Sequence, residues 1–135
     1  MRRLAASVYD LLLLAGLWML AGLTVLSLRG GVAVPPGTYW FQALLLALTA
    51  VFYIGFWTRG GQTLGMRSWR LRAERRDGRP LKLATASLRF LAALLSLAPA
   101  GLGLLWILVD PDKLAWHDRL TDSRVVLLAK DEARR

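Results

Sequence analysis

The fold of this chain is decided by the stretch from Arg3 to Leu28, which reads RLAASVYDLLLLAGLWMLAGLTVLSL. From Leu11 onward the stretch contains no charge, and it is long enough to cross the hydrocarbon core of a membrane as a helix. One acid, Asp10, stands at the start of that run, where a carboxylate is costly unless another group neutralises or uses it. The stretch therefore predicts a membrane helix, and it makes the partner of Asp10 the main functional question.

Two further apolar blocks, Tyr39 to Thr58 and Phe90 to Val109, also lack charged residues and have a similar length. The chain is 56% hydrophobic with a mean hydropathy of +0.42, which is too apolar for an ordinary soluble domain. A cleaved signal peptide is the alternative for the first block, because basic residues precede it. The acid within the run and the length of the run argue against that alternative. The three blocks predict an integral membrane protein.

Basic residues set the expected orientation. Arg2 and Arg3 precede the first block, and the linker 29–38 carries only Arg29. The linker 59–82 carries Arg59, Arg67, Arg70, Arg72, Arg75, Arg76, Arg79 and Lys82. Because positive charge is enriched in cytoplasmic loops, the N-terminus and the second linker are predicted to be cytoplasmic. Aromatic residues at both ends of the second block, Trp40 and Trp57 among them, are read as interfacial anchors.

The third block has two open interpretations. Pro99, Gly101 and Gly103 interrupt it, and such residues break or bend a helix. Two short helices would form a re-entrant hairpin and return the tail to the cytoplasm, whereas a single kinked span would place the tail outside. The basic tail favours the hairpin, because it would otherwise conflict with the charge rule.

Two segments have the pattern of strands. Residues 68–74 alternate in polarity and are followed by the turn signal Asp77-Gly78, and residues 124–128 are rich in β-branched and apolar side chains. We predict that the two segments pair. The expected fold is an all-α membrane protein with two transmembrane helices, a third Pro/Gly-interrupted hydrophobic element (re-entrant hairpin or kinked span), and a small cytoplasmic β-element. Residues 1–130 are predicted to form one membrane domain, and residues 131–135 a charged tail.

Composition argues against several classes of function. The chain has no cysteine and one histidine, so thiol chemistry is excluded and a catalytic metal is not expected. No pattern of a nucleophile and a base is evident, so we expect neither an enzyme nor a cofactor. The net charge of +9 comes from residues that flank apolar blocks, which favours anionic lipid headgroups over nucleic acid as the partner.

Four separated motifs together resemble the RDD family of bacterial and archaeal integral membrane proteins. The motifs are Arg3-x-x-Ala6-x-x-x-Asp10, Gly61-Gln62-Thr63-Leu64-Gly65-Met66-Arg67, Asp77-Gly78-Arg79-Pro80 and His117-Asp118-Arg119-Leu120. The resemblance implies that Arg3, Asp10 and Asp118 are the residues for which the family is named. It also implies a multi-pass protein of the cytoplasmic membrane, proposed to act in transport, with sodium/proton antiport associated with some members. The chain departs from the family at Asp122-Ser123, where Gly-Thr is usual.

Asp10 itself allows two interpretations. It could exchange a proton for a monovalent cation, or it could form a static ion pair with Arg3 or Arg89 that fixes the helix register. Arg67 is expected to neutralise Asp10 or Asp118. His117 beside Asp118 could relay protons or act in a structural cap.

A second set of arginines is predicted to contact lipid headgroups: Arg70, Arg72, Arg75, Arg76 and Arg119. This set supports the alternative function, a non-transporting scaffold or accessory subunit that binds anionic lipid or a partner protein. Transport through so few helices would require a homo-oligomer.

Overall fold

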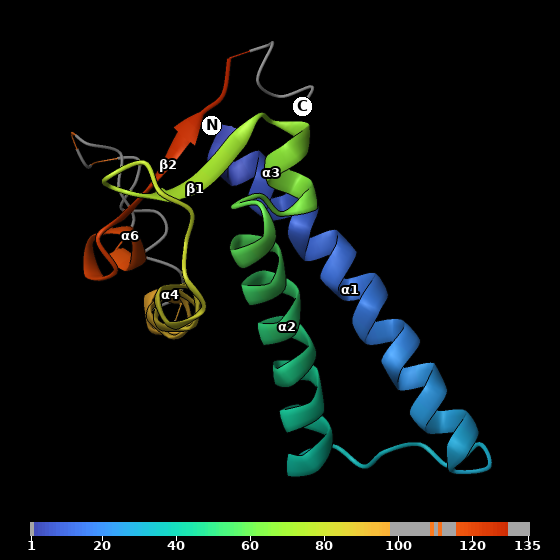
Figure 1. Cartoon of the computed structure of the whole chain (residues 1–135). Helices are drawn as coiled ribbons and strands as arrows, with labels where there is room; N and C mark the ends of the chain where they lie inside the picture. The colour runs from blue at the N-terminus through green and yellow to red at the C-terminus, as the bar shows by residue number, and fades with distance from the viewer. Residues whose placement is uncertain (1, 98–108, 110, 112–115, 130–135) are drawn as a thin grey trace.

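Two long helices form the body of the protein (Figure 1). The computed structural model describes residues 2–97, 109, 111 and 116–129. Its elements, in chain order, are α1 (Arg2–Leu28), α2 (Tyr39–Arg59), α3 (Leu64–Ser68), β1 (Leu71–Arg75), α4 (Leu83–Leu97), α6 (Trp116–Leu120) and β2 (Ser123–Leu127).

The helices α1 and α2 are long and apolar enough to cross a membrane, at the two places predicted. They contain 27 and 21 residues, which correspond to roughly 40 and 30 Å of helix at about 1.5 Å per residue. Leucines along α1 are turned outward, with Leu12 68% and Leu20 62% exposed. In a bilayer these side chains contact acyl chains, so the exposed apolar surface fits a membrane protein.

The two long helices contact each other through a polar pair as well as through apolar residues. The indole Nε1–H of Trp18 donates to Thr49 Oγ1 at 3.0 Å, and Thr49 Oγ1 donates to the carbonyl of Leu45 at 2.8 Å. A hydroxyl that is bonded in this way carries little cost inside a membrane. The contact holds α1 and α2 together near the middle of the pair.

The predicted strand pairing is confirmed. Strands β1 and β2 form a two-stranded antiparallel sheet with Leu71 opposite Leu127 and Ala73 opposite Val125. An ion pair between Arg124 Nη2 and Glu74 Oε1, at 2.8 Å, lies across the same two strands. Strand β1 precedes α4 in the chain and β2 follows α6, so the sheet joins the two ends of the segment that contains these helices.

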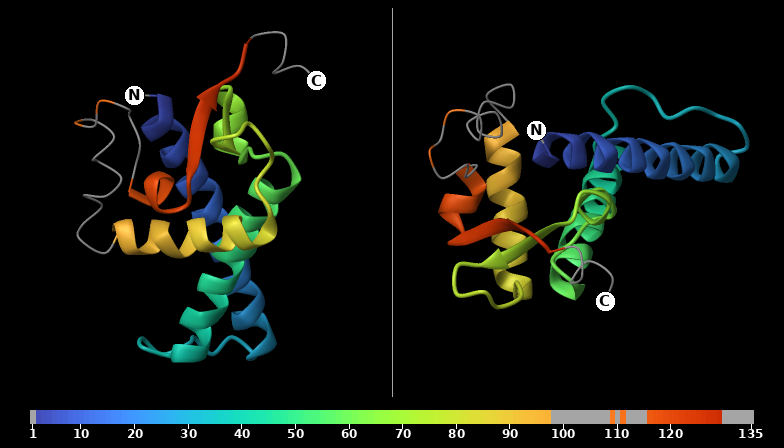
Figure 2. Two further views of the ribbon diagram at one scale, coloured as in Figure 1. Left: turned by 60° about the vertical axis from the view of Figure 1, so that its left-hand side comes forward. Right: turned by 90° about the horizontal axis from the view of Figure 1, so that it is seen from above.

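The third hydrophobic element begins earlier than predicted. Helix α4 starts at Leu83 instead of Phe90. Arg89, the charged residue just before the apolar block, lies inside this helix with its side chain buried. Figure 2 shows α4 lying across α2, not alongside it. Leu91 and Leu95 point outward, at 56% and 69% exposed. The break at residues 99–103 lies outside the described residues, so the hairpin stays a prediction.

The core lies where α1 begins and α2 ends, beneath α3 and the sheet (Figure 1). It consists of Ala6, Trp57, Met66, Leu71, Ala73, Leu81, Ala86 and Phe90. Trp57 is 6% exposed, so its expected role as an interfacial anchor is wrong. Trp40, at the other end of α2, is 50% exposed, as an anchor requires. Of the charged tail, residues 131–135 lie outside the described residues.

Candidate functional site

Asp10 is held by α3 through two hydrogen bonds. The carboxylate is 3% exposed; it accepts from the Thr63 hydroxyl at Oδ2 and from the Gly65 backbone N–H at Oδ1, the latter at 2.9 Å. Thr63 in turn accepts from the Met66 N–H at 3.2 Å and so caps α3. The acid therefore fastens the start of α3 to the first turns of α1.

Gly65 is the residue that allows this close approach. A Cβ at position 65 would lie 2.3 Å from the carbonyl oxygen of Ala6 and 2.9 Å from Cγ of Asp10. Only glycine lets the two backbones come together at this distance. Gly65 thus serves the packing of α3 against α1.

Asp118 lies at the centre of a buried ion cluster that joins α1, α4 and α6. Its Oδ2 is 2.7 Å from Nη2 of Arg3, and its Oδ1 is 2.6 Å from Nη2 of Arg89. Asp118 is fully buried and Arg89 is 2% exposed. Charges this deeply buried are tolerated only when paired and hydrogen-bonded, so the three residues depend on one another.

Arg89 makes further contacts that fix its guanidinium. Its Nη1 donates to Ser123 Oγ at the start of β2, and its Cζ lies 5.0 Å from the centre of the Trp57 ring. Ser123 Oγ is 2.8 Å from Thr121 Oγ1. The departure from the family at Asp122 is accommodated, because Asp122 adopts φ +47°, which aspartate tolerates better than most residues.

His117 is buried beside the cluster, with its Nε2 3.7 Å from Oδ1 of Asp118. Burial, the largest cause, and the charge of Arg89 lower the pKa of His117 to about 4. Asp118 opposes this shift, and Arg3 adds to it. The imidazole is therefore neutral at pH 7.

This shift predicts an acid sensitivity that one substitution removes. The pKa of His117 is lower in the folded state than the ordinary value of 6.5, so its stabilising contribution is present above pH 6.5 and is lost as the pH falls toward 4. By pH 5 the folded state should lose about 2 kcal/mol from this residue alone. His117→Gln removes the only histidine of the chain, so its stability should change less between pH 7.5 and 5.

The measurement is the unfolding midpoint of both proteins in detergent at several pH values. Equal pH dependence in the two proteins would show that His117 is not buried in its neutral form.

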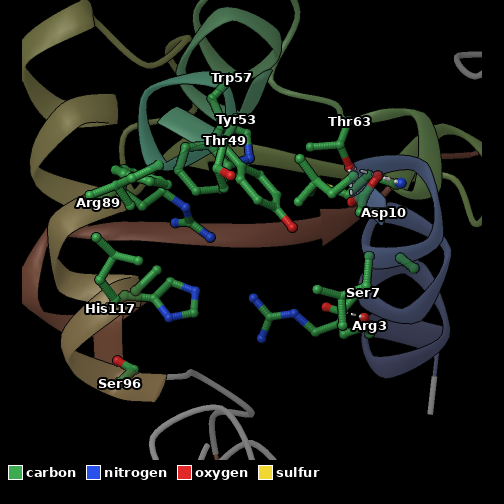
Figure 3. A pocket seen from close by; sticks show the side chains of 18 of the residues that line it. Arg3, Ser7, Asp10, Thr49, Tyr53, Trp57, Thr63, Arg89, Ser96 and His117 are labelled. Atoms are coloured by element: carbon green, nitrogen blue, oxygen red, sulfur yellow. Dashed lines mark hydrogen bonds between the residues drawn. The ribbon is translucent and has the colours of Figure 1, made fainter. Parts of the chain in front are cut away.

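A cavity of about 480 Å³ lies between α1, α2 and α4 (Figure 3). Arg3, Asp10, Arg89 and His117 line it together with the Tyr53 side chain. Figure 3 shows Arg3, Arg89, His117 and the Tyr53 hydroxyl pointing toward a common space, while Asp10 is turned toward Thr63. Much of the rest of the wall is apolar, with Leu11, Leu14, Leu45, Leu46 and Phe90. Polar side chains also line it: Ser7, Gln42, Thr49, Thr63 and Ser96.

The structure brings most of the predicted site residues together but changes their pairing. Arg3 and Arg89 contact Asp118, so neither forms the ion pair that the sequence suggested for Asp10. Arg67 is exposed, and the expectation that it neutralises Asp10 or Asp118 is wrong. Gly65 and Met66 form the buried face of α3, and Arg67, the residue after them, lies on the exposed face.

The predicted lipid-contacting arginines lie around the sheet, away from the cavity. Two of them face acids: Arg75 is 4.0 Å from Asp77, and Arg76 is 3.2 Å from Asp122. The lipid contacts of this set, which also includes Arg70, Arg72 and Arg119, stay predictions. In the described ranges, no group of three or more metal-binding side chains occurs.

Several residues of the site were not predicted from the sequence. Tyr53 lies in a segment that read only as membrane helix, Trp57 was read as an interfacial anchor, and Ser123 was noted only as a departure from the family. Thr63 had a usable signal, because threonine directly before a helical segment is a common N-cap. Nothing in the sequence indicated that its hydroxyl would reach Asp10.

The comparison with protein families gives one match, and it covers most of the chain. The family model described as RDD family matches residues 1–122. No curated protein and no solved structure matches the chain. The match includes Arg3, Asp10 and Asp118, so the buried cluster and the α3 contact both lie within the family region.

Proposed function

Because this membrane protein belongs to the RDD family, we propose that it exchanges a proton for a monovalent cation such as Na⁺, with Asp10 as the exchange site. One observation carries the proposal. Asp10 is a buried carboxylate in the wall of a cavity, and it takes part in none of the ion pairs of the described residues. A buried acid in a membrane helix marks a functional site by default.

The partners of Asp10 support exchange more than static pairing. The nearest arginines of the site, Arg3 and Arg89, are bound to Asp118. Asp10 is satisfied by a hydroxyl and an N–H, which hold its position but leave its charge to be neutralised by another group. A proton or a small cation can do so in turn, and the hydroxyls of Ser7 and Tyr53 in the same wall are oxygen ligands that suit a hard cation.

The wider setting of the proposal follows from the sequence. We propose a multi-pass protein of a bacterial or archaeal cytoplasmic membrane with a cytoplasmic N-terminus and anionic lipids around it. Two membrane helices enclose no aqueous path by themselves, so exchange would take place in a homo-oligomer, for which cyclic symmetry is the usual arrangement. The proposed role is not enzymatic.

The test is Asp10→Asn in sealed proteoliposomes that contain a pH-sensitive dye. Wild-type protein should collapse an imposed pH gradient when Na⁺ is added, and Asp10→Asn should reduce the rate at least tenfold because an amide does not ionise. Asparagine keeps the size of the side chain and can still accept from Gly65, so the fold should survive.

The matched control is Asp77→Asn, which changes an acid at the exposed turn after β1 and should leave the rate unchanged. Exchange by Asp10→Asn at the wild-type rate would contradict the proposed site. Wild-type liposomes that hold the gradient would contradict exchange itself. That result would favour the accessory role, in which the basic surface around the sheet binds anionic lipid or a partner protein.

A further inference from the structure

We propose that the cavity also binds an anionic single-chain amphiphile, a fatty acid or a lysophospholipid, with its head beside Arg89 and its chain between α1 and α2. The inference goes beyond the proposed function and does not require ion exchange. It rests on unpartnered donors at one end of the cavity, on an apolar wall at the other, and on an opening toward the surface that faces lipid.

The head end carries buried donors that need an acceptor. In the described part of the chain, two buried donors, Arg89 Nε and Trp57 Nε1, have no hydrogen-bond partner. Arg89 is 2% and Trp57 6% exposed, and both line the cavity. Leaving such donors unpaired is costly, and the oxygens of a carboxylate or phosphate would satisfy them. The positive charge of Arg89 favours an anionic head over a neutral one.

The arrangement in Figure 3 places further donors around the same space. The Arg3 guanidinium points from α1 toward His117, and the Tyr53 hydroxyl points from α2 into the space between Arg89 and Asp10. The carboxylate of Asp10 lies in the same wall but accepts its hydrogen bonds from α3. A head group can therefore approach the donors of α2 and α4 without displacing the contacts of Asp10.

The other end of the cavity suits an acyl chain. Leu14 and Leu45 line it, and so do Leu11 and Leu46, which are 58% and 49% exposed. Residues that border both the cavity and the surface mark an opening between the two long helices. The volume of 480 Å³ falls in the range of about 300–1,000 Å³ that is usual for sites of small ligands. An amphiphile can enter the cavity from the bilayer through this opening, with its acyl chain lying between α1 and α2.

A bound anion and an ionised Asp10 should repel each other. A negative head in the cavity is repelled by an ionised Asp10 and tolerated when Asp10 carries a proton or a cation. Asp10→Asn should therefore bind the amphiphile at least as tightly as wild type, even though it should lose exchange. The two proposals thus fail separately.

The test is native mass spectrometry of the full chain in detergent, titrated with oleate, lysophosphatidylglycerol, oleyl alcohol and acetate. Either anionic chain should bind at least tenfold more tightly than the neutral alcohol or the chainless acetate. The stronger of the two identifies the head as carboxylate or phosphate. Equal binding of oleate and oleyl alcohol would overturn the proposal.

Two variants locate the site. Leu45→Trp fills the chain end and should reduce oleate binding at least tenfold, whereas Val51→Trp, on the same helix with Val51 71% exposed and outside the cavity, should not. Trp57→Phe removes one donor but keeps a ring against Arg89, and should weaken oleate severalfold without affecting oleyl alcohol. Wild-type oleate binding by both Leu45→Trp and Trp57→Phe would place the ligand elsewhere and overturn the assignment.

Discussion

Gly65→Ala is expected to prevent the chain from reaching a stable fold. The added Cβ would lie 2.3 Å from the carbonyl oxygen of Ala6, so α3 would have to move away from α1. That movement breaks the bonds from Gly65 and Thr63 to Asp10 and leaves a buried carboxylate unsatisfied. Each hydrogen bond to a charged group contributes about 1.5–3 kcal/mol, so the loss is comparable to the whole stability of many domains, about 5–15 kcal/mol.

The matched control is Gly16→Ala in α1, the helix that Gly65 packs against. A Cβ at position 16 meets no atom within 4 Å, and alanine favours helix by up to about 1 kcal/mol over glycine. Size-exclusion chromatography and thermal unfolding in detergent should give a monodisperse, stable Gly16→Ala protein and an aggregated or absent Gly65→Ala protein. Equal stability of the two variants would show that α1 and α3 do not pack as described.

Asp118→Ala should have the second largest effect, a loss of about 3–5 kcal/mol in the free energy of unfolding. Removing the carboxylate leaves the guanidinium of Arg89 buried without its counter-charge and facing that of Arg3. The measurement is the unfolding free energy in mixed detergent. A loss below about 1 kcal/mol would contradict a buried ion cluster.

Two further variants distinguish the loss of the buried ion cluster from the effect of removing any aspartate. Asp77→Ala removes an acid that is 45% exposed and lies about 4 Å from two arginines, so it should cost less than about 1 kcal/mol. Arg89→Met combined with Asp118→Ala should cost less than the sum of the two single changes, because the double variant leaves no buried cation at position 89.

The sequence was sufficient to predict elements whose signal is local. Apolar runs without charge located both long helices, and β-prone segments on either side of the third block located the sheet. In each case the physical cause, apolar burial or strand alternation, is written in consecutive residues.

The pairing of charges could not be predicted, because it depends on tertiary placement. Arg3 and Asp10 share a face of α1, yet Arg3 pairs with Asp118 of α6. The hydrogen-bond donors for Asp10 come from α3 and its N-cap, Thr63. Arg89 was read as the charge at the start of the third block. The carboxylate that neutralises it in the interior belongs to Asp118, 29 residues further along the chain. Spacing along one helix carries no information about such partners.

The ion pair between Arg3 and Asp118 joins residues separated by 115 positions, and this separation sets an order for biosynthesis. A ribosome makes Arg3 well before Asp118, with Ser123 and β2 later still. Both long helices can therefore enter the membrane before Asp118, the acid that pairs with Arg3 and Arg89, is synthesised. The segment from α6 to β2 completes the ion cluster, so a nascent protein that stops short of α6 lacks the carboxylate that neutralises Arg89.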